Sequence, residues 1–165
     1  MTKPVEDIQA ISMADHSGLR VKTNDCTAYK SLNNSAVVAE EVADIAADCP
    51  MIFLRDEMSG RFQLSALFGF TAGENLFVDE KGAWSGSYVP LNLAIKPFST
   101  PTESDSEADT LCINVNSPKV SKSEGRKLFE DGTESPYLIN MRQQLETVID
   151  ATVQTEKLTA EFYGT

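Results

Sequence analysis

The sequence predicts an α+β domain, in which a mostly antiparallel sheet at about residues 50–115 is packed by two helices. Residues 62–68 alternate apolar and polar side chains, the period of a strand with one buried face. Short turn-forming segments flank this strand, which favours antiparallel neighbours because parallel strands need long crossovers. Apolar residues at helical spacing precede and follow the sheet region, at about 35–49 and about 136–162.

The sheet is predicted as a meander of four consecutive strands. Its turns are rich in Gly, Asp and Glu, residues that favour chain reversal. The four strands are expected at residues 51–54, 62–68, 76–78 and 84–89. Two further strands are expected outside the meander: an edge strand at 18–22, and another strand at 110–115.

Each predicted helix has a start or stop signal. The stripe through Val38, Val42, Ile45 and Cys49 should end before a proline, because the residue ahead of proline is disfavoured in the α region. The second helix should start at residues 135–136, where a capping serine precedes a proline in the first turn. If continuous, it would be about 40 Å long at 1.5 Å per residue. Residues 121–124 match a capping box, which predicts a short helical turn.

Composition indicates one soluble domain spanning residues 1–165. The net charge of −11 argues against nucleic acid and anionic membranes, which are bound mainly through Lys and Arg. No apolar run approaches the length of a membrane span, and no apolar segment resembling a signal peptide follows Met1. Three widely spaced cysteines suit reduced thiols, so we expect a cytoplasmic protein without membrane insertion.

Metal and cofactor chemistry finds little support in the residues. His16 is the single histidine, so sites that need two histidines are excluded, and we expect it at the surface or at a strand edge. Cys26, Cys49 and Cys112 include no close pair of the kind structural zinc sites use. The glycines form no nucleotide-binding fingerprint. We therefore predict no metal and no cofactor.

A binding groove is the first site hypothesis. Trp84 and Tyr88 lie four apart on a predicted strand and should share one face; with Phe98 they would line a groove for an apolar or peptide ligand. The alternative is that these rings are core. Glu74 and Asn75 follow a glycine beside large apolar residues, which suits either a buried polar contact or a turn.

Three other groups of side chains leave alternatives open. Glu74 and Asp79 could act as acid and base of a small-molecule enzyme if they faced each other across a cleft. Leu145 and Ile149 lie on the long helical stripe, and could contact a partner, build a homo-oligomer, or be core. A small basic cluster could bind an anion or simply be solvated, and it comprises Lys122, Arg126 and Lys127.

Several motifs, in order, resemble those of the SapC family. The central one spans residues 50–98 and contains ENLFVDEKGAW, YVP and KPF. The segments LRVK, LCINVNSP and EGRKLFEDG flank it, so the resemblance runs from about residue 16 to about 160. Cys49 and Lys96 stand where the resemblance implies aromatic residues. It also implies that members continue past the last helix, so we expect a short or truncated SapC-like domain.

The resemblance implies a limited function. The family name links it to surface-array protein transport genes, and related chains are often labelled as peptide-transport components. A chain with no spanning segment and no ATP-binding loop is neither a permease nor a transport ATPase. We therefore expect a soluble accessory protein that binds a protein or peptide partner linked to export. The enzyme and the structural homo-oligomer subunit remain the alternatives.

Overall fold

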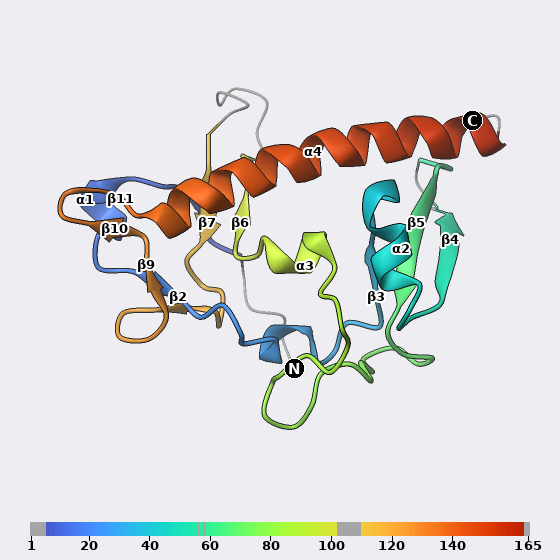
Figure 1. Cartoon of the computed structure of the whole chain (residues 1–165), viewed down its shortest axis with the longest axis horizontal. Coiled ribbons are helices and arrows are strands. Elements are labelled where there is room, and N and C mark those ends of the chain that lie inside the picture. The colour runs from blue at the N-terminus through green and yellow to red at the C-terminus, as the bar shows by residue number, and fades with distance from the viewer. Residues whose placement is uncertain (1–5, 56, 58, 102–109, 164–165) are drawn as a thin grey trace. The chain divides into compact units, whose positions relative to one another are not determined.

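The computed structural model of the chain describes residues 6–55, 57, 59–101 and 110–163. It has an α+β fold with several small antiparallel sheets and a long C-terminal helix, which confirms the predicted class (Figure 1). The chain divides into two compact units. Unit 1 comprises Met1–Ala28 and Ile95–Leu145, and unit 2 comprises Tyr29–Ala94 and Glu146–Thr165. The expected single domain over 1–165 stays a prediction.

Unit 1 contains three small antiparallel sheets among its described residues, with strand orders β1-β7-β6, β8-β2-β9 and β10-β11. Its largest fully buried side chains include Phe98, Ile113, Leu128 and Leu138. The elements are β1 (Ile8–Ala10), α1 (Met13–His16), β2 (Arg20–Val21), β6 (Phe98–Ser99), β7 (Cys112–Asn114), β8 (Val120–Ser121), β9 (Arg126–Lys127), β10 (Phe129–Glu130) and β11 (Thr133–Glu134). The strand expected at 110–115 is thus present as β7.

Two local predictions in unit 1 were wrong. The predicted edge strand at 18–22 is β2, which lies at the centre of its sheet, between β8 and β9. The predicted helical turn at 121–124 is instead the connection between β8 and β9. Ser121 Oγ accepts the amides of Ser123 and Glu124, as in a helix cap, but the chain must return at once because both strands pair with β2.

Gly125 completes this tight connection. Its φ is +96°, and a Cβ there would lie 2.3 Å from the carbonyl oxygen of Val21. A side chain is therefore excluded both by the backbone conformation and by the close approach of β2. Gly125 therefore lets the chain turn back onto β2.

Unit 2 is built on a three-stranded antiparallel sheet in the order β3-β5-β4. β5 pairs with β3 through Ala66↔Ser35 and with β4 through Leu64↔Phe53. The elements that lead into or belong to this unit are η1 (Thr27–Tyr29), β3 (Asn34–Ala36), η2 (Ala39–Glu41), α2 (Val42–Ile45), β4 (Met51–Arg55), β5 (Phe62–Leu67) and α3 (Leu91–Ala94). The first hairpin of the predicted meander, β4–β5, is thereby confirmed.

The helix predicted at about 35–49 is present only at its centre, as the short helices η2 (Ala39–Glu41) and α2 (Val42–Ile45). Residues 34–36 are extended because they pair with β5, and only Val42–Ile45 is α-helical. Val38, Ile45 and Cys49 of the predicted stripe are nevertheless buried. The apolar positions therefore predicted burial correctly. The helical spacing did not predict the conformation of residues 34–36, because they pair with β5.

The second half of the predicted meander was also wrong. Residues 76–78 and 84–89 form no strands; a single bridge joins Val78 to Trp84. Asp79 Oδ1 instead accepts the backbone amides of Lys81 and Ala83 at 2.8 Å each. Short polar side chains that bond the backbone in this way compete with a sheet ladder and hold the segment as turns.

The predicted long C-terminal helix is confirmed as α4 (Pro136–Tyr163). Ser135 caps it: its Oγ accepts the amide of Leu138 at 3.2 Å. The later turns of α4 belong to unit 2, where Ala39 N donates to Thr155 Oγ1 at 2.8 Å and the Tyr163 ring stacks on Phe62. None of the helices described has the length and apolarity needed to cross a membrane.

Glu41 joins several segments of unit 2 although only 2% of its surface is exposed. Its Oε1 accepts the amide of Val38 at 3.0 Å, and its Oε2 accepts the amide of Leu91, at the start of α3, at 2.8 Å. The side chain of Tyr88 also hydrogen-bonds this carboxylate. A buried carboxylate is tolerated here because it has several donors.

We predict that Glu41→Ala destabilises the protein by about 3 kcal/mol, because it leaves buried donors without an acceptor. Urea denaturation of the wild-type chain and the variant measures the change. Glu40→Ala, at the exposed neighbouring residue, is the matched control and should cost less than about 0.5 kcal/mol. Equal losses in the two variants would contradict the bridging role of Glu41.

Candidate functional site

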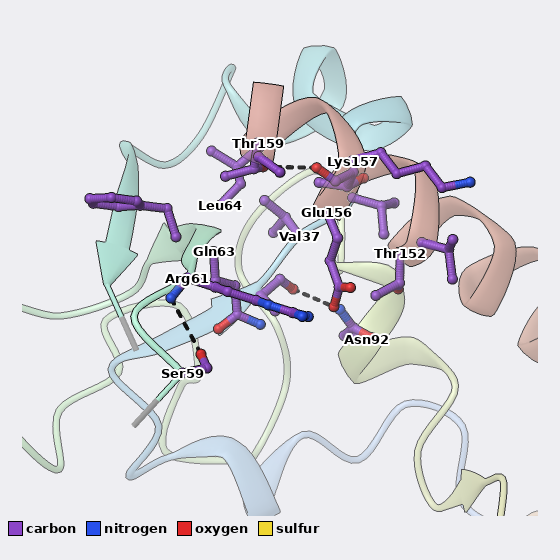
Figure 2. Close-up of a pocket in the computed structure, with 16 residues that line it drawn as sticks. Val37, Ser59, Arg61, Gln63, Leu64, Asn92, Thr152, Glu156, Lys157 and Thr159 are labelled. Carbon is purple, nitrogen blue, oxygen red and sulfur yellow. Dashed lines mark hydrogen bonds between the residues drawn. The ribbon is translucent and has the colours of Figure 1, made fainter. Parts of the chain in front are cut away.

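A cavity of about 560 Å³ lies within unit 2, beside the sheet and the later turns of α4. This volume falls in the range of typical ligand pockets. Four segments line it: residues 36–38, residues 59–64, Asn92 of α3, and residues of α4 between 152 and 160. We call this cavity the α4 groove (Figure 2).

Apolar side chains and hydrogen bonds hold the walls of the α4 groove. Phe62 and Leu64 contribute from β5, and the stacked ring of Tyr163 lies 4.0 Å from that of Phe62. Asn92 Nδ2 donates to the carbonyl oxygen of Ala36 at 2.9 Å, which ties α3 to β3. The hydrogen bond from Ala39 N to Thr155 Oγ1 connects the segment after β3 to α4. Hydrogen bonds thus join the elements that form the walls.

Two opposite charges point into the α4 groove, and no ion pair joins either of them to another residue in the described part of the chain. Arg61 enters from the start of the β5 segment and Glu156 from α4, and Figure 2 shows both side chains directed toward the cavity. Neither takes part in either of the two ion pairs present among the described residues, Lys22–Asp25 and Arg142–Glu134. Lys157 also lines the cavity, but its side chain extends away from it.

The α4 groove can bind polar and charged groups of a ligand against apolar walls. An Arg guanidinium presents a fork of donors that matches a carboxylate, and Glu156 can accept from an ammonium or guanidinium group. The amide nitrogen of Asn92 is already engaged with the carbonyl oxygen of Ala36. The described residues hold no cluster of three or more His, Cys, Asp or Glu that could bind a metal ion.

Sequence reasoning did not find this groove. Arg61 and Glu156 lie far apart in the chain, and each is an ordinary charged residue in an ordinary context. The alternation of residues 62–68 did predict that one face of β5 is buried. No local signal showed that the later turns of α4 would lie beside that strand.

The predicted binding residues Trp84 and Tyr88 do come together, although not on a strand. The indole Nε1 of Trp84 donates to the carbonyl oxygen of Tyr88 at 2.8 Å. The Trp84 ring stacks on Phe77 at 5.3 Å and meets Phe68 edge-on at 5.2 Å. Trp84 thus packs with other aromatic rings, and neither Trp84 nor Tyr88 lines the α4 groove; their binding role stays a prediction.

The loop that carries Tyr88 is held by two carboxylates. Burial, together with the negative charge and the hydrogen bond of Glu41, raises the pKa of the Tyr88 phenol to about 12. Asp48 Oδ2 accepts the hydroxyl of Ser87 at 2.7 Å and also its amide. These bonds from Ser87 lower the pKa of Asp48 below its usual value.

Glu74, Asn75 and Asp79 all bond the backbone of turns. Glu74 Oε2 accepts the amide of Phe70 at 2.9 Å, and Asn75 bridges the amide of Phe77 and the carbonyl oxygen of Tyr29. Asp79 caps its own turn, as described above. None of the three lines the α4 groove. Their geometry matches the turn-forming alternative, and the acid–base hypothesis receives no support from it.

The remaining predicted residues lie apart from one another. Phe98 is fully buried in unit 1, where its ring lies 6.1 Å from that of Tyr137. On α4, Leu145 is buried, whereas Ile149 is 38% exposed. The two therefore do not form one exposed stripe. Whether they contact a partner or a second copy stays a prediction.

The other candidates were a histidine, three thiols and a basic cluster. His16 is 2% exposed, so its expected surface position was wrong; its ring bonds Ser12 and Gln9. The cysteines are free and buried, and burial raises the pKa of each thiol: Cys26, Cys49 and Cys112. The three basic residues are all exposed, as the solvated alternative expects: Lys122, Arg126 and Lys127.

The chain is thus an α+β protein that carries the α4 groove, and its described residues hold no metal cluster. A family model described as SapC matches residues 11–163. The chain therefore belongs to the SapC family, as its motifs indicated. No curated protein and no solved structure matches it.

We predict that Trp84→Ala lowers the free energy of unfolding by about 3 kcal/mol, because it leaves a cavity beside Phe68 and Phe77. Trp84→Phe keeps a ring there and should cost about 1 kcal/mol, mainly the lost indole hydrogen bond. Urea denaturation of both variants measures this. An undiminished stability of Trp84→Ala would show that the ring is not core and is available for a ligand.

We predict that Asp48 contributes stability that depends on pH. Its pKa is lowered in the folded state, so the contribution is present above the unfolded value of about 3.9 and is lost as pH falls through the folded pKa. Asp48→Asn should therefore destabilise at pH 6 and less at pH 2, as measured by urea denaturation. Asp150→Asn, exposed on α4, is the control. Parallel pH profiles for wild type and Asp48→Asn would contradict this.

Proposed function

We propose that this SapC family member is a cytoplasmic accessory protein that binds an extended segment of a protein partner linked to export or surface assembly. The α4 groove would hold that segment. The observation that supports this most strongly is that Arg61 and Glu156, which form no ion pair with any described residue, both point into a cavity with apolar walls. The segment would carry an acidic side chain for Arg61 and a basic side chain for Glu156.

The groove favours a peptide over a purely apolar ligand. Burying a charged group without a partner is costly, so a ligand that fills this cavity gains by pairing with both Arg61 and Glu156. Val37, Phe62 and Leu64 supply contacts for apolar side chains between the charges. A polypeptide segment with mixed side chains meets all of these requirements in one molecule.

The cellular setting of the proposal has two supports. Free buried thiols at all three cysteines suit a reducing compartment. Membership in the SapC family supports a link to export, because the resemblance described above implies surface-array protein transport; the family model covers residues 11–163. The partner is therefore sought among proteins destined for the cell surface.

A charge exchange tests the groove directly. A displayed library of random heptapeptides is selected on the wild-type chain and on the double variant Arg61→Glu/Glu156→Arg, which keeps the net charge. We expect the wild-type chain to select peptides with one acidic and one basic position. The double variant should select peptides in which these two positions are exchanged, because each pocket charge has been reversed.

The exchange Glu80→Lys/Lys81→Glu is the matched control, since both residues are exposed and neither lines the α4 groove. It should select the same peptides as the wild-type chain. Thermal unfolding confirms that each variant folds. Selection of no peptides, or of the same peptides by the Arg61/Glu156 exchange, would contradict the proposed binding site.

The link to export needs a cellular readout. Cells that lack this chain are labelled with a membrane-impermeant amine reagent, and their labelled surface proteins are compared with those of the parent. We expect at least one surface protein to be depleted, and to be restored by the wild-type chain but not by the Arg61/Glu156 exchange. An unchanged surface composition would contradict a role in export even if peptide binding holds.

A further inference from the structure

β4 presents an open edge of the unit 2 sheet, since the strand order is β3-β5-β4. Leu67 N donates to the carbonyl oxygen of Pro50, which makes this a hydrogen-bonded pair of the antiparallel ladder. Because such pairs alternate, Ile52 and Leu54 bond β5, while the backbone groups of Met51, Phe53 and Arg55 face outward. The outward groups of Met51 and Phe53 meet no partner within the part of the chain that the structure describes.

The other edge of the same sheet, at β3, is bonded to side chains of other elements. Beside β3, the carbonyl oxygen of Ala36 accepts Asn92 Nδ2, and the amide of Ala39 just beyond it donates to Thr155. Side chains from α3 and α4 therefore cover that edge. Within β4 no proline, lysine or glycine occurs, and Arg55 is the single charged residue of the strand. Phe53 is 45% exposed on it.

We propose that β4 pairs antiparallel with β4 of a second copy, about a twofold axis through Phe53. This surface is distinct from the α4 groove, and the inference does not depend on the proposed function. In this register Phe53 faces its own counterpart and exchanges two backbone hydrogen bonds with it. Met51 of each copy faces Arg55 of the other, and each such pair exchanges two more.

The charge pattern of β4 favours a second copy as the occupant. In the twofold register the charged Arg55 lies opposite the apolar Met51, so no like charges face each other across the new ladder. The aromatic side chains of Phe53 meet at the axis, next to the ring of Tyr163, whose centroid is 5.3 Å from that of Phe53. The twofold register therefore pairs Phe53 with itself and contains no repulsive charge pair.

The register predicts opposite effects for two charges at one position. Met51→Glu places a carboxylate opposite Arg55 of the second copy, and Met51→Lys places a like charge there. Because the twofold axis creates two such pairs, we expect the dimer dissociation constant to fall by about 2- to 30-fold for Met51→Glu and to rise by a similar factor for Met51→Lys. Sedimentation equilibrium of the full chain measures both.

Two further variants separate this surface from the helix. Phe53→Pro removes an outward amide and should convert a dimer of twice 18.0 kDa into an 18.0 kDa monomer. Phe53→Val keeps that amide and should remain dimeric. Ile149→Asp, on the exposed side of α4, should leave the dissociation constant unchanged. Since each copy carries a net charge of −11, raising the salt concentration should strengthen the dimer.

A wild-type chain that is a monomer at 100 μM and 0.5 M salt would overturn the proposal. A monomer that binds an unrelated extended peptide at β4 would overturn it equally. It is also overturned if Met51→Glu and Met51→Lys change the dissociation constant in the same direction. Loss of the dimer in Ile149→Asp would assign the interface to α4 instead. Circular dichroism confirms the fold of each variant, and the Met51 pair retains the test if Phe53→Pro does not fold.

Discussion

The carboxylate of Glu41 is the constraint on which the rest of unit 2 depends. It accepts the amide of Val38, the amide that begins α3 at Leu91, and the side chain of Tyr88. These groups come from segments about 50 residues apart in the chain. Breaking these hydrogen bonds would leave buried polar groups without partners, which is costly. The carboxylate of Glu41 therefore orients the three segments that donate to it, although they have little regular structure of their own.

The α4 groove follows from that constraint. Once α3 is placed, Asn92 reaches the carbonyl oxygen of Ala36, and the segment after β3 bonds Thr155 of α4. The later turns of α4 then lie beside β5, and the Tyr163 ring rests on Phe62. Hydrogen bonds that begin at Glu41 therefore connect α3, β3 and the turn of α4 that carries Glu156 of the groove.

The two proposals concern different surfaces of unit 2. The α4 groove presents charged side chains, so a ligand there would be selected by its own side chains. The edge of β4 presents backbone groups, so a strand there would be selected by its extended conformation and register. A family member with both could dimerise through one surface while binding a partner segment at the other, because the residues that line the groove do not include those of β4.

The sequence by itself determined the α+β class, the β4–β5 hairpin, the capped start and full length of α4, and the family. These features rest on local signals: alternation at 62–68, a serine–proline cap at 135–136, and a helical stripe from Leu138 onward. The local pattern predicted the wrong conformation for much of residues 35–49 and for residues 84–89. The apolar spacing there indicated which residues are buried, but not whether they form a helix, a strand or a turn. Only the tertiary structure decided those segments, because pairing with β5 extended one and side-chain bonds from Asp48, Asn75 and Asp79 folded the other into turns. It also decided the groove, since Arg61 and Glu156 meet one cavity only after distant segments have folded together.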